Sequence, residues 1–162
     1  MRILQESFKN PSRTRRDAMP VQATLVRHSE IVLVRPIPFH GLCEQHLLPF
    51  YGVVHIGYVP GEKRLRYDEF ASIVEACSGG IRVQQKMTTR IGLWLDHQLG
   101  APGLGVLLEG GYACTPVRDG AALAGPTTTM AFYGSMRDSA HQQREFLTLT
   151  RKTTESKDEC PS

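Results

Sequence analysis

The change of hydrophobic period in the middle of the chain most constrains its fold. Apolar side chains recur at steps of three and four residues over 70–77, and at steps of four over 83–95. Both stripes predict helices with one buried face. Gly79-Gly80 separates them, Asp68 is a candidate N-cap for the first helix, and Gly100 ends the second. The centre of the chain is therefore predicted to be a pair of helices.

Extended segments flank this pair on both sides. Residues 23–36 and 52–59 are rich in Val and Ile and predict strands, and strands return over 104–117 and 125–136. A short polar helix and the stretch REFLTLTR complete the pattern. The order ββααββ predicts an α+β domain in which two long helices pack on one face of an antiparallel sheet. Such a sheet has two edges, so we expect edge pairing between subunits.

One domain accounts for the 162 residues. We assign 1–22 to an N-terminal arm, 23–152 to the domain, and 153–162 to a disordered tail. The arm carries several arginines, but no aromatic residues interleave with them and the net charge is only +3, so we expect no nucleic-acid binding. Without a secretory signal or an apolar run near the roughly 20 residues that span a bilayer, we expect a cytoplasmic protein that does not bind membranes.

Cys43 and His46 form a C-x-x-H pair between two apolar runs. This spacing is compatible with zinc binding, but a buried thiol beside a hydrogen-bonded histidine produces the same pattern. Cys114 is the candidate third ligand, because it follows Gly110-Gly111 in a predicted strand where close backbone approach is expected. Three protein ligands leave one zinc position open for water, which is typical of catalytic rather than structural sites.

Three blocks of the sequence resemble the GTP cyclohydrolase I family. In chain order they are IPFHGLCEQHLLPFYGVVHIGYVPGEK, VQQKMTTRIG and REFLTLTRK, and the resemblance runs from about Ile31 to Lys152. It implies the tunnelling fold (T-fold), in which subunits join their sheets into a barrel with active sites at their interfaces; the family's rings of five suggest a decamer. It also implies Zn²⁺ bound by Cys43, His46 and Cys114. The implied reaction opens the purine five-membered ring at C8 and releases formate.

The chain departs from the family pattern at the positions of the histidines that assist proton transfer. The family's CEHH is Cys43-Glu44-Gln45-His46 here, and a second family histidine falls on Tyr112. Neither Gln nor Tyr titrates near neutral pH. Glu44 remains as a general base or an oriented ion-pair partner, and His40 either supplies an imidazole or is a structural strand residue. The predicted catalytic set is Glu44, Gln45, Tyr112 and His40.

The positions that hold substrate in the family have also changed. The family's VQER is VQQK here, and the carboxamide of Gln85 suits a different base edge from a carboxylate. Where the family has SK and then an arginine, this chain has Asp68-Glu69 and Ser72, which adds negative charge where a triphosphate would lie. Arg118 is retained at a position that resembles a family phosphate ligand. The predicted substrate-binding set is Gln84, Gln85, Arg118, Asp68 and Glu69.

These changes predict a zinc-dependent hydrolase whose substrate differs from that of the family. The expected substrate is a purine-like or related nitrogen heterocycle, as a free base, nucleoside or monophosphate, rather than GTP. Two alternatives stay open. One is ordinary GTP cyclohydrolase I activity, which converts GTP to dihydroneopterin triphosphate and formate, carried by substitute residues. The other is a non-catalytic paralogue that binds a ligand or assembles with an active cyclohydrolase.

Overall fold

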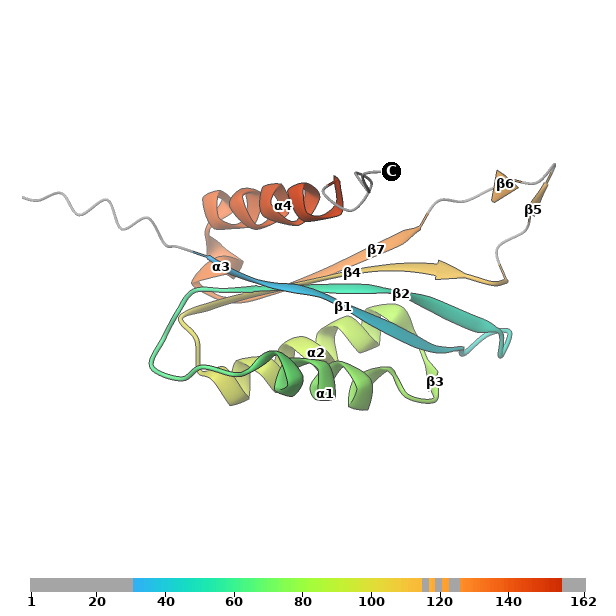
Figure 1. Cartoon of the computed structure of the whole chain (residues 1–162), viewed down its shortest axis with the longest axis horizontal. Helices are drawn as coiled ribbons and strands as arrows, with labels where there is room; N and C mark the ends of the chain where they lie inside the picture. Colours follow the sequence, from blue (N-terminus) through green and yellow to red (C-terminus); the bar gives the residue numbers. More distant parts are fainter. Residues whose placement is uncertain (1–30, 115–116, 119–120, 123–125, 156–162) are drawn as a thin grey trace, which may run out of the picture.

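The computed structural model describes residues 31–114, 117–118, 121–122 and 126–155. Within these ranges a five-stranded sheet lies between two layers of helices (Figure 1). The elements in chain order are β1 (Val32–Cys43), β2 (Pro49–Tyr58), α1 (Tyr67–Ser78), β3 (Ile81–Arg82), α2 (Gln84–Leu99), β4 (Gly103–Tyr112), β5 (Val117–Arg118), β6 (Ala121–Ala122), β7 (Thr127–Gly134), α3 (Ser135–Asp138) and α4 (Ala140–Glu155).

The long elements confirm the predicted α+β order. The sheet runs β3-β1-β2-β4-β7, and its four long strands pair antiparallel. Helices α1 and α2 cover one face of the sheet, as predicted, and α4 lies over the opposite face (Figure 1). The structure adds β3, which pairs parallel to the end of β1, and the hairpin of β5 and β6. Strands of two residues carry no periodicity, so the sequence pattern could not predict them.

Two apolar layers hold the helices to the sheet. The larger lies between the sheet and the α1–α2 pair and includes Phe50, Ile91 and Leu108, all with no exposed surface. The smaller lies beneath α4, where Phe146 and Leu107 are buried. The stripe that predicted the second helix is thus a core face of α2, since its central members are fully buried.

Strand β1 continues past the predicted end of the first strand, through Pro36 and Pro38 to Cys43. Residues 23–30 of that prediction lie outside the described part of the chain. Proline is tolerated because, among the described strands, β1 pairs on its outer side only at its last two residues, with β3. A register shift between Val34 and Ile37 accommodates the first proline. This extension places Cys43 at the very end of the strand.

The start of α1 corrects the predicted N-cap. Arg66 is the N-cap residue, and its main-chain N–H donates to the Glu69 carboxylate at 2.6 Å. Asp68 lies inside the first turn instead, where its carboxylate accepts hydrogen bonds from the Arg66 guanidinium. Asp and Glu are favourable in a first turn because they face the positive end of the helix dipole.

Helix α4 ends at Glu155, so residues 153–155 of the predicted tail are helical. The remainder of the tail and the N-terminal arm lie outside the described residues. Over the helices that the structure describes, no segment has the length and apolarity needed to cross a membrane.

Candidate metal centre

The turn between β1 and β2 brings Cys43 and His46 together. The Cys43 N–H donates to the Leu48 carbonyl at 2.9 Å, and the Leu47 N–H donates to the Cys43 carbonyl at 2.8 Å. Leu47 has a φ of 54°, in the left-handed region that a leucine seldom adopts. The turn is therefore held closed at some conformational cost. It leaves Cys43 Sγ 3.9 Å from His46 Nδ1.

Cys114 reaches the same place through long-range pairing of β4 with β2. Phe50 pairs with Tyr112, and the Ala113 N–H donates to the Pro49 carbonyl at 3.0 Å. β4 ends at Tyr112, short of the predicted strand end at 117, so Cys114 lies in the turn that follows. The pairing sets this turn beside the one that carries His46.

The three predicted ligands converge. The ligand atoms of Cys43, His46 and Cys114 all lie within 4.8 Å of one another. Zinc–sulfur bonds of about 2.3 Å at a tetrahedral angle place two sulfurs about 3.8 Å apart, so small side-chain movements close this set on an ion. Two thiols and an imidazole are also the donors that zinc prefers. The residues therefore fit a zinc ion with one coordination position left open.

The two thiols differ in acidity. The pKa of Cys43 is lowered, mainly by the hydrogen bond with His46 and then by the main-chain N–H groups of Gln45 and His46. The pKa of Cys114 is raised, first by burial and then by its interaction with Cys43. Cys43 is therefore the first of the pair to become a thiolate as pH rises.

We expect zinc affinity to rise with pH through the neutral range. Zinc binds thiolates, so protons compete with the metal, and the raised pKa of Cys114 keeps its proton in competition to higher pH. Displacing one or two protons corresponds to roughly a ten- to hundred-fold gain in affinity per pH unit. Competition against a chromophoric chelator between about pH 6 and about pH 8 measures this slope. A pH-independent affinity contradicts thiolate ligation.

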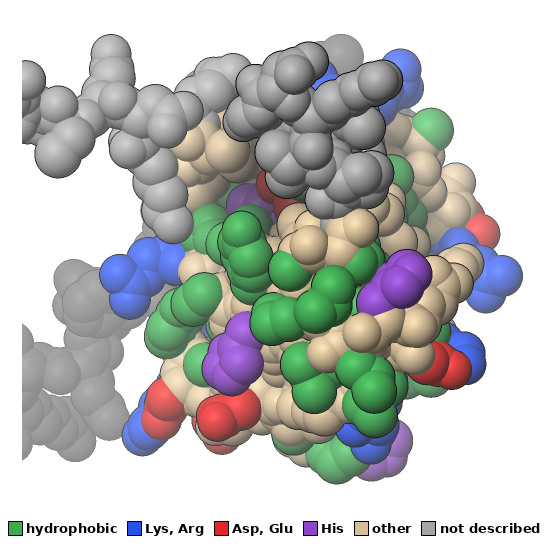
Figure 2. Space-filling model, turned by 90° about the vertical axis from the view of Figure 1, so that its right-hand side faces the viewer, with side chains coloured by type: hydrophobic (Ala, Val, Ile, Leu, Met, Phe, Trp, Pro, Cys, Tyr) green, Lys and Arg blue, Asp and Glu red, His purple; other side chains and the backbone are tan. Residues whose placement is uncertain are grey.

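A pocket of about 350 Å³ opens beside the ligand atoms. Its lining residues are Cys43, Glu44, Gln45, Arg82, Val83, Tyr112, Cys114 and Thr127. Figure 2 views the molecule from the end that carries the β1–β2 turn, and hydrophobic and histidine side chains gather on this face. Three of the predicted catalytic residues, Glu44, Gln45 and Tyr112, are thus brought to the metal ligands.

Tyr112 contributes a neutral phenol to the pocket. Its ring stacks on Phe50, with ring centroids 5.3 Å apart and planes 12° from parallel. Its pKa is raised, first by burial and then by the nearby Cys43 and Cys114, against the opposing effect of the Gln84 main-chain N–H. The hydroxyl therefore stays protonated at neutral pH and serves as a hydrogen-bond donor rather than a base.

His40 is not brought to the pocket of its own chain. Phe39 and Cys43 face the helices and are buried, whereas His40, at the alternate position of β1, is exposed on the other face of the sheet.

Gln84 does not line the pocket, but its amide is hydrogen-bonded to Thr127, which does. Its side chain is buried, and Nε2 donates to the Thr127 carbonyl at 2.7 Å and the Leu108 carbonyl at 3.2 Å. These bonds tie the start of α2 to β4 and β7. Gln85, the next residue on the helix, is exposed and does not line the pocket.

The remaining predicted substrate residues lie elsewhere in the chain. Asp68 and Glu69 are in the first turn of α1, and the last turn of this helix leads to β3 beside the metal centre. The 12 residues of α1 span about 18 Å, so the two carboxylates are near the opposite end of the domain. Arg118 is in β5, paired with Ala121, and its side chain lies outside the described part.

Three lining residues, Arg82, Val83 and Thr127, were not predicted as site residues from the sequence. Arg82 is the Cα partner of Cys43 in the parallel pairing of β3 with β1. Gly80, with a φ of 80°, allows the sharp turn from α1 into β3. The Gly79-Gly80 pair was therefore the local signal of this turn, but nothing local indicated that it leads to Cys43.

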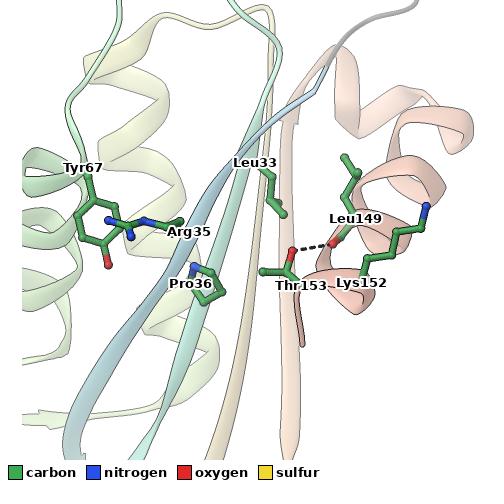
Figure 3. A pocket seen from close by; sticks show the side chains of 7 residues that line it. All are labelled: Leu33, Arg35, Pro36, Tyr67, Leu149, Lys152 and Thr153. Carbon is green, nitrogen blue, oxygen red and sulfur yellow. Dashed lines mark hydrogen bonds between the residues drawn. The ribbon is translucent and has the colours of Figure 1, made fainter. Parts of the chain in front are cut away.

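A larger hollow of about 620 Å³ lies at the open edge of β1. Figure 3 shows Arg35 directed toward Tyr67 on one side of the strand, while Lys152 extends from α4 on the other side. The Arg35 guanidinium lies 5.0 Å from the centroid of the Tyr67 ring. Because the two cations diverge, the hollow marks a strand edge that no other described strand covers rather than a convergent binding site.

The comparisons of the sequence with a family profile and with individual known proteins agree on one family. A sequence profile described as GTP cyclohydrolase I matches residues 1–151, which includes the arm. GTP cyclohydrolase 1 of Deinococcus radiodurans is 36% identical over 125 residues, covering 77% of this chain and 58% of the relative. GTP cyclohydrolase 1 of Homo sapiens is 36% identical over 124 residues, covering 76% of this chain and 50% of the relative. The chain thus spans between half and two thirds of the length of these relatives.

Comparison of the structure supports the T-fold. A crystal structure of the archaeosine synthase QueF-Like in the apo form matches with a TM-score of 0.52 at 14% sequence identity, covering 65% of this chain and 94% of that chain. At this level of identity the likeness concerns the fold alone. The profile match and the identity to the curated relatives establish more: the chain belongs to the GTP cyclohydrolase I family.

Proposed function

We propose that this protein is a zinc-dependent hydrolase that opens a ring of a purine-like heterocycle, presented as a base, nucleoside or monophosphate rather than as GTP. The observation that carries the proposal is the convergence of Cys43, His46 and Cys114 beside a pocket. Its described lining residues include a carboxylate, a guanidinium and a neutral phenol, and no histidine. The candidate metal ligands are thus present, while the residues at the family's proton-transfer positions differ.

Residues of this chain carry out the proton transfer and orient the substrate. A zinc ion held by the three ligands would supply a more acidic water and would polarise the bond under attack. Glu44 accepts the proton of the attacking water and returns it to the ring nitrogen that leaves as the C–N bond breaks. Tyr112 donates a hydrogen bond to the heterocycle, and Gln45 orients it or the water through its amide.

We also propose a homo-oligomer with active sites between subunits, a decamer if the family's rings of five are kept. Among the described strands, the outer side of β1 is paired only at its last two residues, and this largely open edge supports assembly because it can add a strand. His40, Gln85, Asp68 and Glu69 lie outside the pocket of their own chain. In an assembly, these residues and Arg118 can take part in a site shared with a neighbouring subunit. Sedimentation equilibrium tests this, because the mass of one 18.0 kDa chain at micromolar concentration contradicts it.

Incubation of the zinc-loaded protein with guanine, guanosine, GMP and GTP tests the function. We expect loss of the purine absorbance and release of formate from at least one of the first three and not from GTP. Glu44→Gln should keep its zinc and lose about 100-fold in rate, a typical contribution of general base catalysis. Zinc binding without turnover of any purine supports the non-catalytic alternative.

Genuine GTP cyclohydrolase I activity is the second candidate, and the 36% identity to enzymes of that name favours it. Release of formate together with a fluorescent pterin from GTP decides for this candidate.

A further inference from the structure

Arg82 is a cation placed beside the metal centre by the fold. It pairs with Cys43 across the parallel β1–β3 contact, and neighbouring strands lie about 4.8 Å apart. Arg82 lines the same pocket as the two candidate cysteine ligands and is half-buried. Among the described residues of the lining, it is the sole positively charged one, and Glu44 is the sole carboxylate.

Main-chain carbonyls hold the guanidinium in one orientation. Arg82 Nε donates to the Cys77 carbonyl at 3.2 Å, and Nη1 donates to the Ile81 carbonyl at 3.0 Å. A guanidinium has further N–H groups, including both on Nη2, so these bonds leave donors available. Within the described ranges no carboxylate lies within 4.0 Å of it, since the ion pairs found there join His55 to Glu109 and Arg66 to Asp68.

A pre-oriented guanidinium with spare donors is suited to bind an oxyanion, because its fork matches carboxylate and phosphate oxygens. We propose that Arg82 binds an anionic group, a carboxylate or a phosphate, on the substrate of the metal centre. This inference rests on the proposed function and narrows its substrate class, because it excludes a neutral base or nucleoside as the preferred substrate. Arg82 is then a specificity-determining residue.

If Arg82 had only a structural role, its substitution would have a different effect. Cys77 lies in the last turn of α1, so a cation on its carbonyl also stabilises the helix end. Loss of that role lowers stability but leaves the preference between charged and neutral ligands unchanged. Arg144 is the matched control, since its Nε also donates to a helix carbonyl, that of Ala140 at 3.2 Å, on α4 across the sheet.

The first experiment compares guanosine, guanosine 5′-monophosphate and guanosine 5′-carboxylate by calorimetry on the zinc-loaded protein. We expect one or both anions to bind about ten- to hundred-fold more tightly than guanosine, the range for a hydrogen bond to a charged group. Arg82→Gln should abolish this ratio while guanosine affinity and zinc content stay unchanged. Arg82→Lys should keep part of the ratio, and Arg144→Gln all of it. A ratio that survives in Arg82→Gln overturns the proposal.

The second experiment needs no purine. Phenylglyoxal modifies accessible arginines, and peptide mass analysis reads each site separately. Inorganic phosphate or acetate should slow the modification of Arg82 several-fold and leave that of Arg144 unchanged, and the more effective anion identifies the preferred group. If neither anion protects Arg82, the proposal is wrong. Protection without binding of any nucleoside keeps the anion site and rejects the purine part of the proposed function.

Discussion

Cys114→Ala is expected to lose stoichiometric zinc and, with it, all turnover above background. Its thiol lies within 4.8 Å of the other two ligand atoms, so its removal leaves only Cys43 and His46. Since the loss of a group that merely orients a ligand costs about 10- to 100-fold in metal affinity, loss of a ligand itself should exceed that range. Metal analysis after gel filtration and chelator competition measure the effect.

Cys77→Ala is the matched control for this variant. Cys77 is also a buried thiol, 2% exposed, but it belongs to the core between the sheet and the helices. Its removal should cost some stability and leave zinc content unchanged. Full zinc occupancy in Cys114→Ala would show that the cluster is not the metal site.

Phe50→Ala is expected to give the largest loss of stability, about 3–5 kcal/mol in the free energy of unfolding. The ring has no exposed surface and contacts Phe39, at a centroid distance of 5.5 Å, as well as Tyr112. Its removal leaves a cavity and deprives Tyr112 of the surface that holds it against the pocket. Urea unfolding at one fixed protein concentration measures the change, since assembly also contributes to stability.

The adjacent residue is the control for this prediction. Tyr51 is an aromatic residue of the same strand, but it faces the other side of the sheet and is 64% exposed. Tyr51→Ala should change the unfolding free energy by no more than about 0.5 kcal/mol. Equal losses in the two variants would contradict the assignment of Phe50 to the core.

Features carried by local patterns were predictable from the sequence. The stripe over 83–95 predicted α2, because a helix that buries one face must repeat its apolar residues at helical spacing. The C-x-x-H pair likewise lies within one turn, so the contact of Cys43 with His46 needs no long-range information. Cys114 was the candidate third ligand from its position after Gly110-Gly111, the resemblance to the family supported it, and the structure brings its thiol to the other two candidate ligands.

Residues whose place depends on strand pairing were not predictable in this way. Whether His40 shares a face with Cys43 depends on strand alternation and on where the strand runs, and the predicted strand ended at residue 36. Gln84 lies in the expected segment, yet its amide is already bonded to carbonyls of β4 and β7, which are distant in sequence. Asp68 and Glu69 lie at the far end of α1 because a helix is rigid.

The sequence alone thus determined the fold class, the helical pair and the candidate ligand pair of Cys43 and His46, because these follow from local spacing and residue type. Only the tertiary structure decided what surrounds the metal. Arg82 lies far from Cys43 along the chain and reaches it through a two-residue parallel strand that has no sequence signature. Contacts of this kind are fixed by the packing of whole elements against one another, and here they set which charged groups line the pocket.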